Sequence, residues 1–279
     1  MRVAVLASGS SGNAVVFEAG STRLMVDAGL SFRQLQRRLH EVGLHVRDLG
    51  GVVISHEHSD HVQGLEVLVR HLEAPVLATA GCAATLDPRF GVEGTLVAGR
   101  EIRVGALAVT PVATRHDAAE PVGFVVRHGE CRVGLATDTG CVGPELLEAF
   151  AGCRAVLLET NHDPDMLRVG SYPWPLKQRI AADTGHLSNL QAMRAIERLC
   201  HAGLEVVVGM HLSRENNRPE LARREIARPV EGSAVKVAVA DQVRPLLVEL
   251  AAVDPGQLSL FEGVRQTRVG WAAELVAGA

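Results

Sequence analysis

Short apolar runs rich in β-branched residues recur along the chain and predict β-strands. They include RVAVLA, AVVFEA and GVVISH in the first half and AVLLET, EVVVGMH and AVKVAVA in the second. Between several of these runs, apolar residues recur at helical spacing over 31–42, 61–72 and 188–201. Apolar positions every third or fourth residue are typical of an amphipathic helix. The pattern therefore predicts an α/β fold.

The order of the predicted elements indicates how they are layered. Strands follow one another early in the sequence, and helices then interrupt the strands in both halves. This order favours two sheets packed face to face with helices outside over a single doubly wound sheet. After Leu250 the sequence changes to turn residues, and no sustained period follows. We expect one domain over residues 1–250 and a separate tail over residues 251–279.

The composition is that of a globular protein, with 47% hydrophobic and 22% charged residues among 279. No apolar run approaches the roughly 18 residues of a membrane span, and the apolar start is too short for a signal peptide. We therefore expect a cytoplasmic protein without a membrane partner. The five cysteines form no C-x-x-C pair, so neither a disulfide framework nor a zinc ribbon is indicated.

The stretch GVVISHEHSDH carries the strongest chemical signal. A β-branched run leads directly into His56, His58, Asp60 and His61. Alternation along an extended strand end places His56 and His58 on one side, and the following turn brings the other two round to face them. Imidazole nitrogens and carboxylate oxygens suit zinc, manganese or iron. The motif predicts a metal site at the end of a strand.

Three later residues of the same chemical types also stand at predicted strand ends. His116 follows LAVTPVATR, Asp138 ends GLATD and His211 ends VVVGMH. A plain loop position remains the alternative for each. His162 in LLETNHD is a second candidate for the place of His116, although no strand run leads directly into it.

The pattern H-x-H-x-D-H, with these later residues in order, resembles the metallo-β-lactamase fold superfamily over residues 1 to about 250. The resemblance implies an αββα sandwich of two mixed sheets with outer helices. It also implies two divalent ions, zinc or manganese, with iron as a further candidate. The implied ligands form two sets that share one bridging carboxylate: His56, His58 and His116; Asp60, His61 and His211; and Asp138 as the bridge. A water activated between two such ions suits attack on a phosphodiester.

His186 and Glu159 complete the predicted catalytic residues, together with Asp60. His186 in TGHLSN stands near the place where nuclease and phosphodiesterase members of that superfamily carry a histidine that contacts the scissile phosphate or protonates the leaving oxygen. An alkoxide departs poorly without a proton, so a general acid there is chemically needed. Glu159 ends an apolar run and can hydrogen-bond His186 or a ligand histidine. A polar role at the start of a helix is the alternative for His186.

Several further stretches narrow the resemblance. LASGSSGNAVVFEAG, MVDAGLS, HDAAEPVGF, ATDTG, ETNHD, GHLSN and HLSRENN together resemble the YycJ/WalJ group of small metallo-β-lactamase fold proteins, which are DNA exonucleases. In the first stretch, Ser10, Ser11 and Asn13 lie in a glycine-containing loop whose N–H groups can approach a phosphate. Relatives with an added β-CASP domain are disfavoured, because only about 70 residues separate Asp138 from His211.

The charge pattern bears on DNA as a partner. The net charge of −4 gives no global attraction to nucleic acid. Arginines nevertheless gather over 33–38 and 214–228, so a basic strip near the site is one reading of them. An ordinary solvated helix face is the other.

The tail contains a second short signal. Gln257, Leu258, Ser259, Leu260 and Phe261 resemble the peptide by which bacterial polymerases and repair proteins bind the ring-shaped sliding clamp. Such a peptide anchors its apolar side chains in a pocket of the partner, and it must lie outside the folded core. A short terminal strand or helix that packs back on the domain is the alternative.

These observations lead to one function and two rivals. We expect a two-metal DNA phosphodiesterase, an exonuclease that acts in DNA repair, with mismatch repair as the candidate pathway, recruited by the sliding clamp. A small-molecule (cyclic) phosphodiesterase on the same site is the first alternative. The second is a clamp-binding regulatory protein without catalytic activity.

Overall fold

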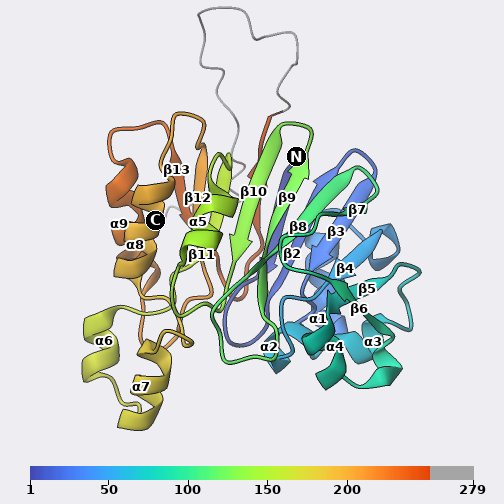
Figure 1. Cartoon of the computed structure of the whole chain (residues 1–279), viewed down its shortest axis with the longest axis horizontal. Helices are drawn as coiled ribbons and strands as arrows, with labels where there is room; N and C mark the ends of the chain where they lie inside the picture. The colour runs from blue at the N-terminus through green and yellow to red at the C-terminus, as the bar shows by residue number, and fades with distance from the viewer. Residues whose placement is uncertain (252–279) are drawn as a thin grey trace, which may run out of the picture.

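Two seven-stranded sheets pack face to face in residues 1–251, the part of the chain that the computed structural model describes (Figure 1). The strands of the first sheet, in spatial order, are β14 (Leu246–Glu249), β1 (Arg2–Ala7), β2 (Ala14–Ala19), β3 (Thr22–Val26), β4 (Gly51–Val53), β5 (Val76–Thr79) and β6 (Val92–Leu96). Those of the second are β13 (Lys236–Val239), β12 (Val206–Met210), β11 (Ala155–Glu159), β10 (Cys131–Ala136), β9 (Val122–His128), β8 (Leu107–Ala113) and β7 (Ile102–Val104). Both sheets contain parallel and antiparallel pairs.

Helices cover the outer face of each sheet. Those beside the first sheet are α1 (Phe32–Glu41), α2 (Ser59–Val62), α3 (Leu65–Leu68) and α4 (Ala80–Thr85). Those beside the second are α5 (Pro144–Phe150), α8 (Asn189–Leu199) and α9 (Pro219–Ala227), while α6 (Pro164–Val169) and α7 (Trp174–Ala181) project from one end (Figure 1). Three short 3-10 helices complete the described elements: Val46–Asp48, Pro88–Phe90 and Arg228–Val230. The predicted sandwich of two mixed sheets with outer helices is confirmed.

Alternation along the central strands explains the layers. In β1, Val3 and Val5 pack into the core between the sheets, whereas Ala4 and Leu6 pack against the helices. A strand that is buried on both faces reads as a continuous apolar run, as RVAVLA does. Among residues 1–251, no helix is long and apolar enough to span a membrane.

The predicted helices differ in how closely they match the helices of the structure. The helix expected over 188–201 is α8, and Ser188 caps it by accepting a hydrogen bond from the Gln191 N–H. The helix expected over 61–72 is wrong in its extent, because the segment folds as the two short helices α2 and α3. Gly64 lies between them and donates its N–H to Ala28 O at 2.8 Å. A Cβ at Gly64 would lie 2.2 Å from Leu30 O, so only glycine permits this close approach.

The same end of the sandwich receives the loops that follow most central strands (Figure 1). The strands β3 and β4 are parallel neighbours in one sheet, as are β10, β11 and β12 in the other. The carboxyl ends of parallel strands meet at one edge of a sheet, and such edges are common ligand sites. The predicted metal and catalytic residues lie in or beside these loops. The tail peptide 257–261 lies outside the described residues.

Candidate metal centre

Three groups of side chains at this edge place potential metal ligands together, and the second and third share Asp138 and His211. Within each group, one ligand atom from every residue lies within 4.8 Å of the others. The groups are His56, His58 and His116; Asp60, His61, Asp138 and His211; and Asp138, Glu159, His186 and His211. The first two groups are the residues of the two predicted ligand sets, with Asp138 grouped with the second. His162 belongs to none of the three and instead forms a β-bridge with Ser188.

The first group consists of three histidines whose rings contact one another pairwise. The Nδ1 of His56 lies 3.0 Å from Ser55 Oγ, and its buried Nε2 has no hydrogen-bond partner. His116 Nδ1 donates to Gly185 O at 3.1 Å, and its Nε2 lies 3.1 Å from His58 Nδ1. When one ring nitrogen is held by an outer partner, the other is left to face a ligand. This group therefore offers nitrogen lone pairs to a common point.

The second group surrounds the carboxylate of Asp138. Its Oδ2 lies 3.0 Å from His61 Nε2, and its Oδ1 lies 3.3 Å from His211 Nδ1. Asp60 Oδ2 lies 3.3 Å from His211 Nε2 on the other side of that ring. Asp138 also lies near the first group, with Oδ1 4.0 Å from His116 Nε2. The carboxylate of Asp138 thus stands between the two groups.

Asp27 is a buried carboxylate beside the second group that was not predicted from the sequence. Its Oδ2 accepts hydrogen bonds from His61 Nδ1 at 2.8 Å and from Ser55 Oγ at 2.9 Å. Its Oδ1 accepts the Ser55 N–H at 2.8 Å. The contact fixes His61 with Nε2 toward Asp138. The signal was present in MVDAGLS, where an aspartate ends an apolar strand.

Backbone strain is concentrated at the same place. Within residues 1–251, the only non-glycine residues with positive φ are Asp27, Asp138 and His211, at 62°, 54° and 52°. Each follows a central strand by one or two residues. A side chain in this left-handed region costs on the order of 1 kcal/mol or more, and such residues cluster at functional sites. The surrounding fold therefore holds these three side chains in position against a local cost.

His186 and Glu159 form a pair at the rim of the centre. His186 Nδ1 donates to Glu159 Oε1 at 2.7 Å, and the same oxygen lies 3.1 Å from His211 Nδ1. The other oxygen of Glu159 accepts the N–H groups of Thr139 and Leu187. Glu159 is fully buried, whereas His186 lines the cavity. The carboxylate therefore orients a histidine whose Nε2 remains available to a bound molecule.

The electrostatics of the centre are dominated by these short contacts. Burial lowers the pKa of His211, but the charge of Asp138 and hydrogen bonds to Asp60 and Glu159 outweigh it and raise the pKa to about 10. Burial and the neighbouring His61 hold the pKa of His56 well below its usual value. Protons on histidines thus balance the buried carboxylates, and a divalent cation bound here competes with those protons.

The Gly9–Asn13 loop lies against the second group. Asn13 donates its backbone N–H to Asp60 O at 2.8 Å, and its side-chain nitrogen lies 3.0 Å from His61 Nε2. Ser10 lines the cavity, whereas Ser11 is exposed and does not line it. The Ser11 N–H donates to Gln242 Oε1 at 3.0 Å. Of the three predicted substrate-binding residues, the structure therefore places Ser10 and Asn13 at the centre and Ser11 beside it.

A cavity of about 270 Å³ opens onto the metal centre. One wall carries the candidate ligands, and the opposite wall comes from α7 and the turn before it. The residues of that second wall are Tyr172, Leu176, Arg179 and Ile180. An ion pair between Arg179 and Asp117, with the shortest N–O distance 2.6 Å, ties α7 to the loop that carries His116. None of these wall residues was predicted, because no motif marks them.

The arginines that the sequence left open as a basic strip or a solvated helix face differ in their surroundings. Arg38 is buried and donates to Leu6 O at 2.7 Å and to Gln242 O at 3.2 Å. Arg228 lies 3.0 Å from Glu225 in an ion pair. Arg223 donates to Val237 O at 3.3 Å. Arg38 thus supports the fold, whereas Arg228 stays 59% exposed in a surface pair. The arginine run over 33–38 is therefore interrupted by a buried member.

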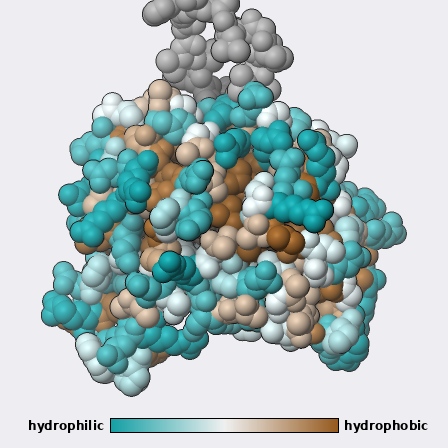
Figure 2. Space-filling view, in the orientation of Figure 1, coloured by the Kyte–Doolittle hydropathy of each residue, from teal (hydrophilic) through white to brown (hydrophobic). Residues whose placement is uncertain are grey.

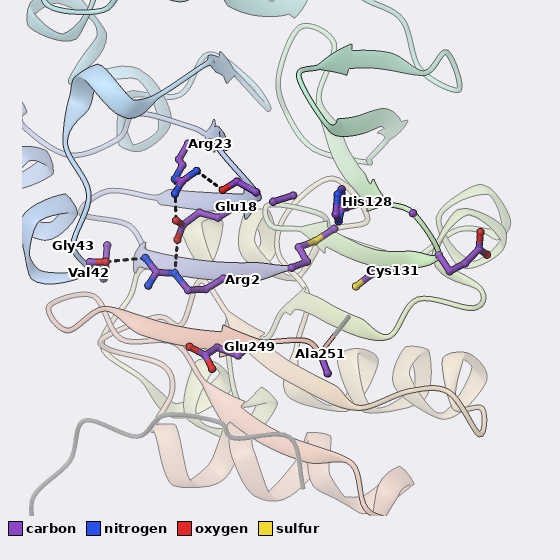
Figure 3. Close-up of a pocket in the computed structure, with 14 residues that line it drawn as sticks. Arg2, Glu18, Arg23, Val42, Gly43, His128, Cys131, Glu249 and Ala251 are labelled. Carbon is purple, nitrogen blue, oxygen red and sulfur yellow. Dashed lines mark hydrogen bonds and ion pairs between the residues drawn. The ribbon is translucent and has the colours of Figure 1, made fainter. Parts of the chain in front are cut away.

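A second and larger cavity, of about 660 Å³, lies at the opposite end of the same strands (Figure 3). Three of its charged side chains are paired with one another. Glu18 forms ion pairs with both Arg2 and Arg23, and Arg2 also donates to Val42 O at 2.7 Å (Figure 3). None of the three groups of potential ligands is found here.

Comparison with known proteins places this site in a family. The beta-lactamase superfamily domain model matches residues 22–212. A protein named exodeoxyribonuclease YycJ from Bacillus anthracis is 34% identical over 248 residues, covering 87% of this chain and 94% of that protein. A protein named exodeoxyribonuclease WalJ from Streptococcus pneumoniae is 32% identical, covering 85% and 91%.

Solved structures agree on the fold. The metallo-β-lactamase fold protein YhfI from Bacillus subtilis superposes with a TM-score of 0.68 at 16% identity, covering 88% of this chain and 98% of that chain. At this identity the likeness bears on the fold alone.

Proposed function

The chain belongs to the beta-lactamase superfamily and has the metallo-β-lactamase fold, and from this premise we propose that it is a metal-dependent DNA exonuclease. The catalytic domain spans residues 1–250. Similarity over nearly the whole of two proteins named exodeoxyribonucleases supports this assignment. The observation that carries it is the convergence of two groups of nitrogen and oxygen donors on one cavity.

The residues of the centre fit divalent cations. His56 offers a buried Nε2 without a hydrogen-bond partner, and the Asp138 carboxylate stands between the two groups. Nitrogen and carboxylate donors of this kind suit zinc, manganese or iron. We assign one ion to His56, His58 and His116, a second to Asp60, His61 and His211, and Asp138 to both. When bound, such ions supply Lewis-acid activation of water and of the phosphodiester.

The chain's own residues supply orientation and proton transfer. Asp27 and Gly185 O hold the outer nitrogens of His61 and His116, so both rings face the cavity. Glu159 holds His186 Nδ1, which leaves His186 Nε2 as the atom that donates a proton to the leaving oxygen. Asn13 holds the loop that receives the phosphate by accepting the Gly9 N–H at Oδ1, and Ser10 faces the cavity as a residue that contacts the phosphate. The carboxylate of Asp60 would bind the ion of the second group. The side chain of Asn13 donates a hydrogen bond to it and so orients it at the junction of this loop and that group.

A direct assay tests the assignment. Full-length protein loaded with Mn²⁺ or Zn²⁺ is expected to release mononucleotides from labelled DNA ends, and a chelator is expected to stop the release. Side-by-side digestion of single- and double-stranded DNA with either end labelled would define the polarity. Intact DNA together with rapid cleavage of a small cyclic phosphodiester would overturn the nuclease assignment in favour of a small-molecule phosphodiesterase.

We further propose that the enzyme acts in cytoplasmic DNA repair, including mismatch repair, and that residues 257–261 recruit it to the sliding clamp. The support is the sequence QLSLF alone. Leu258→Ala with Phe261→Ala is expected to abolish capture by immobilised clamp while hydrolysis of short free DNA stays within twofold of wild type. Equal capture of this double variant would refute clamp recruitment and leave the nuclease assignment standing.

A further inference from the structure

We propose that Arg179 binds a phosphate of the DNA strand one nucleotide away from the phosphodiester that is cleaved. This inference rests on the proposed nuclease function and deepens it, because it names a second part of the substrate that the site recognises. That phosphate is either the terminal monophosphate of the digested end or the next internal phosphodiester. Both groups offer anionic oxygens of the same kind to a guanidinium.

Helix α7 places Arg179 at the cavity. The helix belongs to the lobe that projects from one end of the sandwich, at the lower left in Figure 2. Three of its side chains line the cavity that opens onto the metal centre: Leu176, Arg179 and Ile180. Residues three and four positions apart in a helix lie on the same face. These three side chains therefore form one face of α7, and that face is a wall of the cavity.

The charges around the cavity single out Arg179. Among the lining residues that the structure describes, it is the only lysine or arginine. Asp60, Asp117 and Asp138 contribute carboxylates to the same lining. The ions assigned to Asp60 and Asp138 would serve the reacting phosphodiester, so a second phosphate in the cavity meets its positive partner at Arg179. A guanidinium presents a planar fork of N–H donors, which suits a phosphate.

Asp117 holds the guanidinium at this wall. Arg179 Nε donates to Asp117 Oδ2 at 2.7 Å, and Arg179 Nη2 lies 2.6 Å from the same oxygen. The other oxygen of Asp117 lies 3.4 Å from His116 Nε2. One carboxylate thus links Arg179 to a candidate metal ligand. Within residues 1–251 the guanidinium has no other hydrogen-bond partner, so its remaining N–H groups can bind a phosphate.

The ion pair alone does not account for an arginine at this place. The Arg179 side chain is 65% exposed in the pair, and an ion pair as exposed as this contributes at most about 1 kcal/mol to stability. The pair of Arg168 with Asp165 on α6 is similar, but neither of its residues lines the cavity. Arg179 differs from Arg168 in its place beside the metal centre. A solvated guanidinium there can exchange part of its hydration for a phosphate.

The surfaces of the cavity match the parts of one nucleotide. The cavity offers metal ligands, the apolar side chains of Leu176 and Ile180, and the guanidinium of Arg179. A strand end offers a reacting phosphodiester, a deoxyribose and a second phosphate. The volume of about 270 Å³ lies just below the roughly 300–1,000 Å³ of pockets that enclose a drug-sized ligand. The cavity therefore suits a single nucleotide, and the phosphate at Arg179 is the neighbour of the cleaved one.

Kinetics with three DNA strands test the contact. The first strand carries a phosphate at the digested end, and the second carries a hydroxyl there. The third has a neutral methylphosphonate at the internal position next to the scissile bond. Loss of hydrogen bonds to a charged group predicts a KM about tenfold higher for Arg179→Ala than for wild type on the first strand. We expect kcat to stay within about twofold.

The two modified strands identify which phosphate is bound. Arg179→Ala is expected to leave KM unchanged on the strand that lacks the phosphate bound by Arg179, because two changes to one contact are not additive. No effect on the hydroxyl strand would assign the terminal monophosphate, and no effect on the methylphosphonate strand would assign the internal one. Arg179→Lys keeps the charge and is expected to recover part of the affinity.

Arg168→Ala is the matched control, because Arg168 is a similarly exposed, ion-paired arginine on the same lobe that does not line the cavity. It is expected to leave KM unchanged on all three strands. An equal rise in KM by Arg179→Ala on all three strands would overturn the phosphate contact. The loss of the pair with Asp117 would then act through the position of α7.

A binding measurement separates this inference from the proposed function. If metal-loaded wild type does not hydrolyse DNA, the fluorescence anisotropy of the same strands, labelled at the far end, measures binding directly. Weaker binding by Arg179→Ala, confined to strands that carry the phosphate, would then refute the nuclease and keep the contact. Hydrolysis with an unchanged KM in Arg179→Ala would refute the contact and keep the nuclease. Absence of hydrolysis with equal binding by both proteins would refute both.

Discussion

The two ends of the sandwich hold cavities that differ in size and in chemistry. The cavity between Arg2, Glu18 and Arg23 is the larger, at about 660 Å³ against about 270 Å³ at the metal centre. In the larger one, the guanidinium groups of Arg2 and Arg23 both pair with the carboxylate of Glu18 (Figure 3). In the smaller one, imidazole rings and carboxylates converge, and His56 Nε2 has no partner. Volume therefore does not locate the site, whereas the convergence of potential ligand atoms does.

Backbone conformation separates the two ends in the same way. All three non-glycine residues with positive φ in the described chain lie at the metal end. The other end is closed by regular pairing, such as the N–H of Leu250 donating to Met1 O at 2.9 Å. A fold retains strain where it holds side chains for chemistry and relieves it elsewhere.

The largest expected effect comes from the shared carboxylate at the metal end. Asp138→Asn removes the charge between the two groups but keeps the shape, and asparagine tolerates the left-handed backbone. Bound metal is expected to fall, and DNA hydrolysis to fall by more than roughly 100-fold, the upper range for loss of an outer partner of a ligand. Metal analysis and end-labelled DNA measure the two losses.

Asp165→Asn, an exposed carboxylate on α6, is the matched control and should keep both properties. If Asp138→Asn retained wild-type metal content and activity, the contrast between the two ends would lose its chemical basis.

A smaller effect is expected when the carboxylate that orients a candidate ligand histidine is removed. Asp27→Asn keeps the backbone but weakens the contact that orients His61 through Nδ1. Loss of such a partner costs about 10–100-fold in metal affinity or activity. Metal titration with a competing chelator measures it, and Asp48→Asn, at an exposed carboxylate that belongs to none of the ligand groups, serves as control. An unchanged metal affinity would show that Asp27 does not position His61.

At the opposite end, the expected effect is on stability instead of activity. Glu18→Gln leaves Arg2 and Arg23 without their charged partner at a site where the Glu18 side chain is 9% exposed. We expect the free energy of unfolding to fall by about 1–3 kcal/mol, as for other poorly solvated partners, with DNA hydrolysis unchanged. Urea denaturation measures the change. Glu41→Gln, from the exposed pair with Arg37, is expected to cost less than about 1 kcal/mol.

The smallest expected effect concerns the thiol of that larger cavity. Burial raises the pKa of Cys131, so the group stays protonated until the pH exceeds this raised value. At pH 8, iodoacetamide is expected to label the exposed Cys200 well before Cys131. Peptide mapping over time measures both rates. Rapid labelling of Cys131 would show that the end opposite the metal centre also holds a reactive group.

The fold could be predicted wherever a strand or helix is strongly patterned. RVAVLA and AVLLET match β1 and β11, and the period over 188–201 matches α8. The edge strands β6 and β7 were not predicted, because they are partly exposed and lack a continuous apolar run. The 61–72 helix was overextended, because the contact of Gly64 with the Ala28–Leu30 loop is a tertiary constraint that periodicity cannot show.

The candidate ligands could be predicted because each stands at the end of a patterned strand or within H-x-H-x-D-H. Side chains that support or flank them could not. Asp117 and Arg179 are 62 residues apart and pair only in the folded chain. Tyr172 and Leu176 belong to no motif, and their place at the cavity follows from where α7 and the turn before it lie in the fold.

The sequence by itself determined the types of ligand and the strands that carry them, because local alternation and chain order place each donor at a strand end. Only the tertiary structure decided which atoms meet. The pairing of two sheets brings His61, Asp138 and His211 together from positions 73 or more residues apart. That pairing also gives Glu159 two histidine partners and leaves His56 Nε2 free. Long-range packing sets these contacts, and no local pattern encodes them.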